Sequence, residues 1–172
     1  QLVFEAITLG AELISASAGL GFAQLADPLR GVTVPVVGQF FTLVATLLFL
    51  SLGGHLVLIE WLARSFTLMP VAADALGREQ LASVLAFSAQ LFAGGLLLGL
   101  PLVIALLAIN LAMGVISRAA PSLNLFAVGF PVTLIAVLVM LYVGMPSLVE
   151  RMTLMFESAW MAVAAFLGGP LR

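Results

Sequence analysis

Three long stretches of this chain carry no charged side chain, and this feature limits the possible folds most strongly. They run from Gly31 to Ile59, from Gln80 to Ser117 and from Ala119 to Val149. A helix that crosses the hydrocarbon core of a bilayer needs about 20 mostly apolar residues, whereas a soluble domain carries charges on roughly 25% of its residues. Only 8% of the residues here are charged, and 63% are hydrophobic. The sequence therefore predicts an all-α, membrane-associated protein without a soluble domain.

The length and the few polar residues narrow the class further. A chain of 172 residues has room for one domain of about four to six apolar helices. Its six Arg residues are scattered and it has no Lys, which excludes a nucleic-acid surface. Cysteine is absent and there is one His, so disulfides and thiolate metal sites are excluded and a zinc site is not expected. The chain begins at Gln1 inside an apolar segment, so we expect a fragment that lacks its own N-terminus.

Residues 1–20 are expected to form a helix with one polar face. Glu5, Thr8 and Glu12 recur at spacings of three and four, which places them on the same side of a helix. One interpretation is a solvated edge. The other is a face that lines a water-filled passage or contacts another subunit, because carboxylates inside a membrane rarely face lipid. Composition alone leaves both open.

Residues 21–34 are expected to form an apolar loop. Glycines and the Asp27-Pro28 step disfavour a continuous helix, while the bulky apolar side chains disfavour open water. The loop is therefore either a buried connector or a movable gate. The residues that define this gate or plug loop are Gly21, Phe22, Leu25, Asp27, Pro28, Gly31 and Val32.

Glycine and proline interrupt the apolar segments that follow. We expect a helical hairpin region over 35–69 and 79–118, and broken C-terminal helices over 121–168. Residues 80–117 are too long for one untilted span, and we expect two helical pieces or one strongly kinked helix there. Each internal Pro frees a carbonyl that neighbouring helices, polar side chains or water must satisfy. The structural and helix-break positions are Gly53, Gly54, His55, Pro101, Asn110, Gly129, Phe130 and Pro131.

Three of the polar or small positions suggest contacts between helices. Gly95 and Gly99 form a GxxxG pair, which lets two helix backbones approach closely. Asn110 lies in a long apolar run and is expected to link helices by a hydrogen bond rather than to bind a ligand. His55 and Glu60 are close in sequence but lie about 140° apart around a helix. We therefore expect His55 to be held by local hydrogen bonds or packing rather than to relay protons.

Catalytic machinery is not visible in the sequence. It contains no nucleophile elbow, phosphate loop, HExxH motif or carboxylates paired at helical spacing beyond Glu5 and Glu12. We therefore expect a protein that is not an enzyme and has no catalytic residues, no metal and no cofactor.

Several short segments, taken together and in order, resemble the FliR family of bacterial type III secretion export gates. Each segment is weak alone, but their order and spacing are specific, and the match covers essentially the whole chain. The missing part is at the front, where the family has further N-terminal helices. The matching segments are Phe22 to Pro28, Phe49 to Leu56, Ser65-Phe66 with Pro70, Leu100 to Leu102, Asn110 to Gly114, Arg118 to Pro121 and Val128 to Pro131.

This resemblance implies an assembly and a location. It implies one subunit of a larger helical hetero-oligomer with FliP-type and FliQ-type subunits and a neighbouring FlhB-type subunit, in the inner membrane of a bacterium. The hairpins of such an assembly pack mainly on one another and are partly lifted out of the lipid. The resemblance also maps a pore constriction onto Gly21 to Val34, through which unfolded export substrates would pass.

The sequence leaves three functions to compare. The first is a flagellar export-gate subunit that forms and closes the conduit, with a virulence-type secretion subunit of the same family as its close alternative. The second is a secondary transporter, which broken helices with sparse polar residues can build. Such transporters often contain inverted repeats, but the three Gly-x-Pro sequences, which start at Gly99, Gly129 and Gly144, are unequally spaced and argue against a transporter. A membrane enzyme is third, because the sequence shows no convergent titratable cluster.

Overall fold

The described residues of this computed structural model form five α-helices. The structure describes residues 1–19, 36–69, 77–120 and 125–167. The helices are α1 (Leu2–Ser17), α3 (Val36–Ser51), α4 (Gly54–Leu68), α5 (Arg78–Ala119) and α6 (Leu125–Leu167). The all-α class predicted from the sequence is therefore confirmed.

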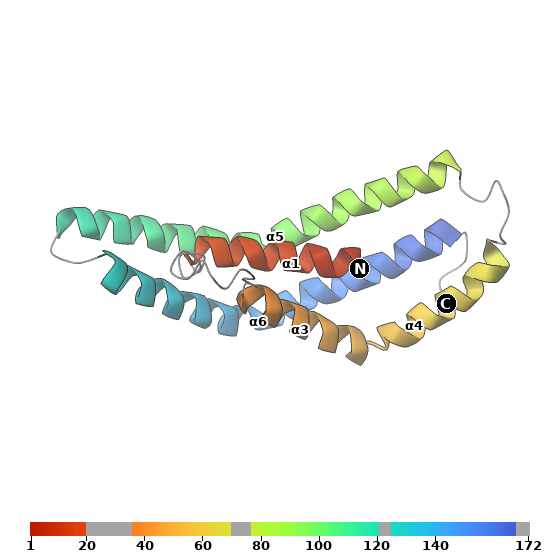
Figure 1. The fold of residues 1–172 in the computed structure, drawn as a ribbon, viewed down its shortest axis with the longest axis horizontal. Coiled ribbons are helices and arrows are strands. Elements are labelled where there is room, and N and C mark those ends of the chain that lie inside the picture. Colours follow the sequence, from red (N-terminus) through yellow and green to blue (C-terminus); the bar gives the residue numbers. More distant parts are fainter. Residues whose placement is uncertain (20–35, 70–76, 121–124, 168–172) are drawn as a thin grey trace, which may run out of the picture.

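The two longest helices form an antiparallel pair. α5 and α6 lie side by side over much of their lengths, and α1 packs against α5 (Figure 1). α3 packs against α1, and α4 continues from the end of α3. The segments predicted as a helical hairpin region, 35–69 and 79–118, contain α3, α4 and α5. The long antiparallel hairpin, in contrast, is formed by α5 and α6.

α5 and α6 do not end at their prolines. Pro101 lies inside α5, and Pro131 and Pro146 lie inside α6. The break predicted within residues 80–117 is a change of direction in one helix (Figure 1), which is the kinked alternative. Broken C-terminal helices were expected over 121–168, and the described residues of that region, Leu125–Leu167, form one continuous helix. A helix can continue through proline where neighbouring groups satisfy the freed carbonyl.

At Pro101 that neighbouring group is an arginine. Proline has no N–H, so the carbonyl four residues earlier, on Leu97, loses its partner within the helix. Nη1 of Arg151 on α6 donates to this Leu97 oxygen at 3.4 Å. α6 therefore satisfies the carbonyl that Pro101 frees, and ties itself to α5 at the kink.

The contact between α1 and α5 is made by small residues. A Cβ added to Gly10 would lie 2.6 Å from the carbonyl oxygen of Gly95, and one added to Gly99 would lie 2.7 Å from that of Gly10. A Cβ on Gly95 would meet the carbonyl of Ala6 at under 3.0 Å. The two backbones touch directly, as the GxxxG pair at Gly95 and Gly99 predicted.

An asparagine fixes the other end of α1. Nδ2 of Asn110 on α5 donates to the carbonyl oxygen of Ser17 at 2.9 Å. The last carbonyls of a helix have no partner within it, so this hydrogen bond satisfies one of them. Asn110 links two helices, as expected.

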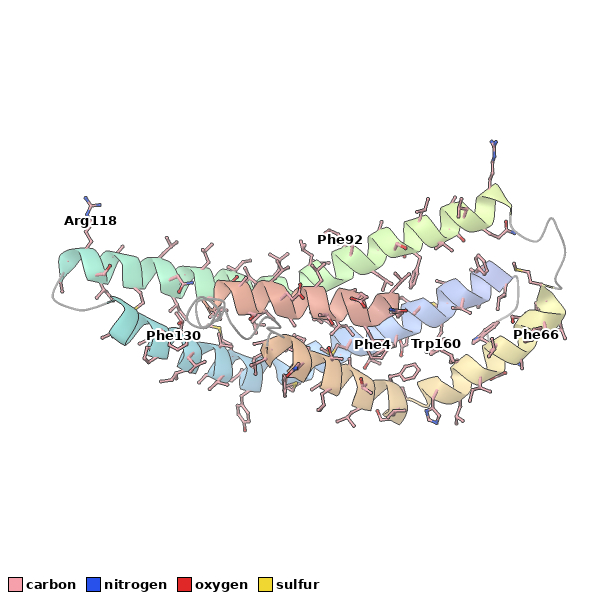
Figure 2. All side chains as sticks on the ribbon, viewed as in Figure 1. Phe4, Phe66, Phe92, Arg118, Phe130 and Trp160 are labelled. Atoms are coloured by element: carbon pink, nitrogen blue, oxygen red, sulfur yellow. The ribbon has the colours of Figure 1, made fainter. Side chains whose placement is uncertain are left out.

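Aromatic rings join the remaining helices to α1. The Phe4 ring centroid lies 5.9 Å from that of Phe49 on α3 and 5.5 Å from that of Phe156 on α6. Trp160 stacks on Phe49 with centroids 6.2 Å apart. Figure 2 shows Phe4 and Trp160 on the same side of the bundle, away from the α5–α6 turn. This cluster holds α3 and α6 against α1.

The Gly95 contact gives a first prediction. Gly95→Ala places a methyl group against the Ala6 carbonyl, and such overpacking costs about 1–3 kcal/mol. Gly114→Ala is the matched control on the same helix, because its added Cβ meets nothing within 4 Å. We expect unfolding in mild detergent to shift to a lower denaturant midpoint for Gly95→Ala alone. Equal midpoints for the two variants would contradict the close contact.

The Asn110 hydrogen bond gives a second prediction. Asn110→Leu keeps a similar volume but removes the donor, and hydrogen bonds between membrane helices average about 0.6 kcal/mol. Ser117→Ala is the control, because the Ser117 hydroxyl donates to Gly114 within its own helix. Hydrogen exchange at the end of α1 should rise in Asn110→Leu and stay unchanged in Ser117→Ala. Unchanged exchange in both would show that the bond does not hold α1.

Candidate functional site

The polar face predicted on the first helix is present on α1. Glu5 and Glu12 are exposed and Thr8 is half-buried, while the side toward the core carries buried residues such as Ile7 and Ile14. With 3.6 residues per turn, the spacings of three and four keep these polar side chains on one face. The structure therefore brings Thr8 and Glu12 toward the same neighbour, α3.

α3 carries a second polar stripe that faces the first. Its members are Gln39, Thr42 and Thr46, again at spacings of three and four. The hydroxyl oxygens of Thr8 and Thr42 lie 3.5 Å apart. The sequence analysis missed this stripe, although its spacing within a charge-free segment was a usable signal.

The two stripes line a groove of about 530 Å³ between α1 and α3. Apart from the polar side chains, its walls contain short or aliphatic residues. The residues that line it are Thr8, Glu12, Gly38, Gln39, Thr42, Leu43, Thr46 and Leu47.

The threonine hydroxyls in the groove donate to their own helix. Thr42 donates to the carbonyl of Gly38 at 2.9 Å, and Thr46 donates to that of Thr42 at 2.7 Å. Their oxygens can still accept hydrogen bonds, while Gln39 can both donate and accept. The Glu12 carboxylate supplies a negative charge. The groove can therefore bind water and the N–H groups of a peptide chain.

The chemistry of the groove is hydrogen bonding rather than metal binding. Within the described ranges, no three His, Asp or Glu side chains lie close enough to hold a metal ion together. Glu60, the partner considered for His55, instead forms an ion pair with Arg64 at 2.6 Å on α4. His55 itself is exposed in the first turn of α4.

The predicted gate or plug loop lies outside the described residues. Its members Gly21, Phe22, Leu25, Asp27, Pro28, Gly31 and Val32 all fall within residues 20–35. The helices on either side of that segment are placed: Glu12, near the end of α1, and Gly38, near the start of α3, both line the groove.

The glycines near His55 form the joint between α3 and α4. Gly53 has φ +68°, which is the left-handed region that glycine adopts readily, and the two helices meet at a bend of 66°. Gly54 is buried, and an added Cβ would lie 2.9 Å from the carbonyl oxygen of Phe49. Any side chain at Gly54 would therefore push the joint apart.

The other predicted helix-break residues lie apart from the groove. Pro101 lies inside α5, and Asn110 of α5 donates to Ser17 at the end of α1. Gly129, Phe130 and Pro131 lie in the first turns of α6, where the Thr133 hydroxyl bonds to the carbonyls of Gly129 at 3.1 Å and Phe130 at 3.0 Å. Figure 2 shows Phe130 near the α5–α6 turn, far from Phe4 and Trp160. These positions shape helices and do not converge on one site.

Most of the remaining surface is apolar. α5 and α6 are each long and apolar enough to cross a membrane, and α3 with α4 passes the same test as a bent pair. The chain is thus a membrane protein with a polar groove on one side.

Comparisons with known proteins agree on one family. The model of bacterial export proteins, family 1, matches residues 1–159. The flagellar biosynthetic protein FliR of Pectobacterium carotovorum is 42% identical over 134 residues, which cover 78% of this chain and 51% of that protein. FliR of Escherichia coli is 37% identical over the same shares of both chains.

A relative with a different name also matches. The surface presentation of antigens protein SpaR of Shigella flexneri is 28% identical over 120 residues, which cover 70% of this chain and 46% of SpaR. The chain spans about half the length of the FliR proteins described above. Because the family model matches nearly the whole chain, this protein belongs to the bacterial export proteins of family 1.

Proposed function

We propose that this chain is part of a subunit of the flagellar-type protein export gate in the bacterial inner membrane, where it helps to form and close the conduit for unfolded substrates. The match of the family model to residues 1–159 carries this proposal. The more similar relatives carry a flagellar name, whereas SpaR is named for surface presentation of antigens, and this favours the flagellar system over the virulence-type alternative.

The groove between α1 and α3 is the wall of the conduit in this proposal. It gathers Glu12, Gln39 and three threonines on a molecule whose other exposed faces are mostly apolar. A conduit for many different polypeptides needs a wall that stays hydrated and holds each segment weakly enough to release it. Hydroxyl, carboxamide and carboxylate groups meet both needs without catalysis, so the subunit acts on its substrate by passage alone.

Closure is assigned to the loop that joins the two walls of the groove. Phe22, Leu25 and the neighbouring apolar residues would exclude water and ions, and glycines such as Gly21 and Gly31 would allow the loop to move aside. The helical partners would be FliP-type and FliQ-type subunits, with an FlhB-type subunit beside them. Their proposed role is to cover the apolar faces that this chain leaves exposed.

Crosslinking to a substrate tests the conduit wall. The chain has no cysteine, so single cysteines at Thr42 and Thr46 can be compared with cysteines at Leu111 and Leu138, which are exposed on α5 and α6. The full-length protein is used in cells that export a stalled substrate. We expect crosslinks from Thr42 and Thr46 and none from Leu111 and Leu138. Equal crosslinking at all four sites, or at the α5 and α6 sites alone, would refute the assignment.

Ion leakage tests the closure. Deletion of Phe22 to Leu25 should raise the conductance of the membrane to small ions, because the apolar plug is shortened. A deletion of equal length from Val71 to Asp74, in the segment between α4 and α5, serves as the control for a general loss of integrity. Unchanged conductance, with the variant present in the membrane at normal levels, would count against a gate in this loop.

A further inference from the structure

The second half of α6 has one face in the core of this chain and one face outside it. Met152 and Phe156 are buried, and Trp160 stacks on Phe49 of α3. Figure 2 shows Trp160 on the same side of the bundle as Phe4, so these residues define the inner face. The opposite side of the helix is exposed, and we call it the α6 outer face. It consists of Glu150, Leu154, Glu157 and Met161.

The spacing of the α6 outer face is that of a helix packed against another helix. Its members follow one another at intervals of four, three and four residues, which keeps them in one row along the helix. Rows with this spacing form the seam between two paired helices. The row is about 16 Å long and can therefore contact one further helix over three turns.

The chemistry of this row suits neither water nor lipid. Leu154 and Met161 are 56% and 53% exposed, and apolar side chains of this size gain free energy when they leave water. Carboxylates such as those of Glu150 and Glu157 are costly in hydrocarbon, where charged side chains pair with one another or face water. The two kinds of group alternate in one row. A neighbour that covers the row must therefore offer apolar contacts and positive charges together.

The described residues of this chain do not neutralise the two glutamates. The positions three and four residues away from Glu150 and Glu157 hold no basic side chain. Arg151 is next to Glu150 in sequence, but its Nη1 donates to the carbonyl oxygen of Leu97 at 3.4 Å. Within the described part of the chain, the ion pair joins Arg64 to Glu60 and involves neither glutamate of α6.

That ion pair shows how a glutamate is neutralised inside this chain. Glu60 is also exposed on an apolar helix, and Arg64 follows it four residues later, which places the two side chains on one face of α4. The Arg64 guanidinium lies 5.7 Å from the centre of the Trp61 ring as well. α6 has no arginine at the equivalent position after either of its glutamates, so its positive partners come from elsewhere.

A second copy of this chain does not supply them. Glu150 and Glu157 are seven residues apart, or about 10 Å along the helix, so a partner helix needs two basic side chains about two turns apart. The chain has no Lys. Among the described helices, α4 and α6 have one arginine each, and the two of α5, Arg78 and Arg118, lie at its opposite ends. A different protein is therefore the better match.

We propose that the α6 outer face docks an apolar helix of a companion subunit that carries two lysine or arginine side chains about two turns apart. Each basic side chain pairs with Glu150 or Glu157, while Leu154 and Met161 pack against the apolar residues between them. Hydrogen bonds between charged groups are about twice as strong as neutral ones, so the two pairs fix the register of the helix on α6. This inference rests on the proposed function for the existence of companion subunits.

Photocrosslinking from the centre of the face tests the docking. A benzophenone amino acid replaces Leu154 in the full-length protein, in cells that produce its companion subunits. The purified complex is irradiated, and mass spectrometry identifies the crosslinked segment. We expect an apolar segment of a companion subunit with two lysine or arginine residues about seven positions apart. The same amino acid at Leu138, which is 59% exposed on another face of α6, is the control and should not reach that segment.

Charge reversal tests the pairing. Glu157→Arg should reduce the crosslink from position 154 to that segment about tenfold, because two positive charges then face each other. Glu5→Arg is the control, since it makes the same change at an exposed position on α1, and it should leave the crosslink unchanged. Replacing the facing basic residue of the partner by glutamate should restore the crosslink of Glu157→Arg, which a misfolded variant would not do.

The outcomes separate this inference from the proposed function. Crosslinks from position 154 to lipid alone, to a second copy, to another segment of the same protein or to a segment without two basic residues would overturn the docking. A charge exchange that fails to restore the crosslink would overturn it as well. Companion subunits that copurify but are not reached from position 154 would refute the docking alone, whereas their absence from the purified protein would refute the proposed function too.

Discussion

The direct contact between the backbones of α1 and α5 sets the position of every other helix. In an apolar environment, water does not drive two helices together, so association depends on close packing and on hydrogen bonds between helices. Gly10, Gly95 and Gly99 allow that packing, because any side chain at these positions would collide with a carbonyl oxygen of the other helix. The hydrogen bond from Asn110 to Ser17 then fixes the far end of α1.

Proline lies inside the two long helices, and at residues 80–117 this fits the kinked-helix alternative that the sequence left open. Pro101 does not end α5, because the carbonyl that it frees receives a hydrogen bond from Arg151. Pro101 and the residue that satisfies the freed carbonyl, Arg151, thus lie on two helices that are far apart in sequence. Near the start of α6, the Thr133 hydroxyl bonds to the carbonyl oxygens of Gly129 and Phe130, so that turn is held locally.

The sequence was sufficient for features that show in the composition and spacing of residues along one segment. The all-α class, the small-residue contact at Gly95 and Gly99, the linking role of Asn110 and the polar face of α1 follow from spacing and composition. The facing stripe on α3 was missed because Gln39, Thr42 and Thr46 gain meaning only when α3 docks against α1. The sequence left open whether α5 is one kinked helix or two pieces, because the partner of the Leu97 carbonyl is 54 residues away. The continuity of α6 was not expected. The gate loop lies outside the described residues, so its role rests on the proposal alone.

The geometry of α1 explains how one small chain can present both a polar groove and an exposed apolar surface. Ala6 and Gly10 lie on the face of α1 that contacts α5, while Glu5, Thr8 and Glu12 lie on the opposite face. Because the small residues must meet α5, the polar residues must point away from it, toward α3. α5 is then free to expose large apolar side chains such as Ile104 and Leu111 on another side. A single close contact between helices therefore keeps the polar groove apart from this apolar face of α5.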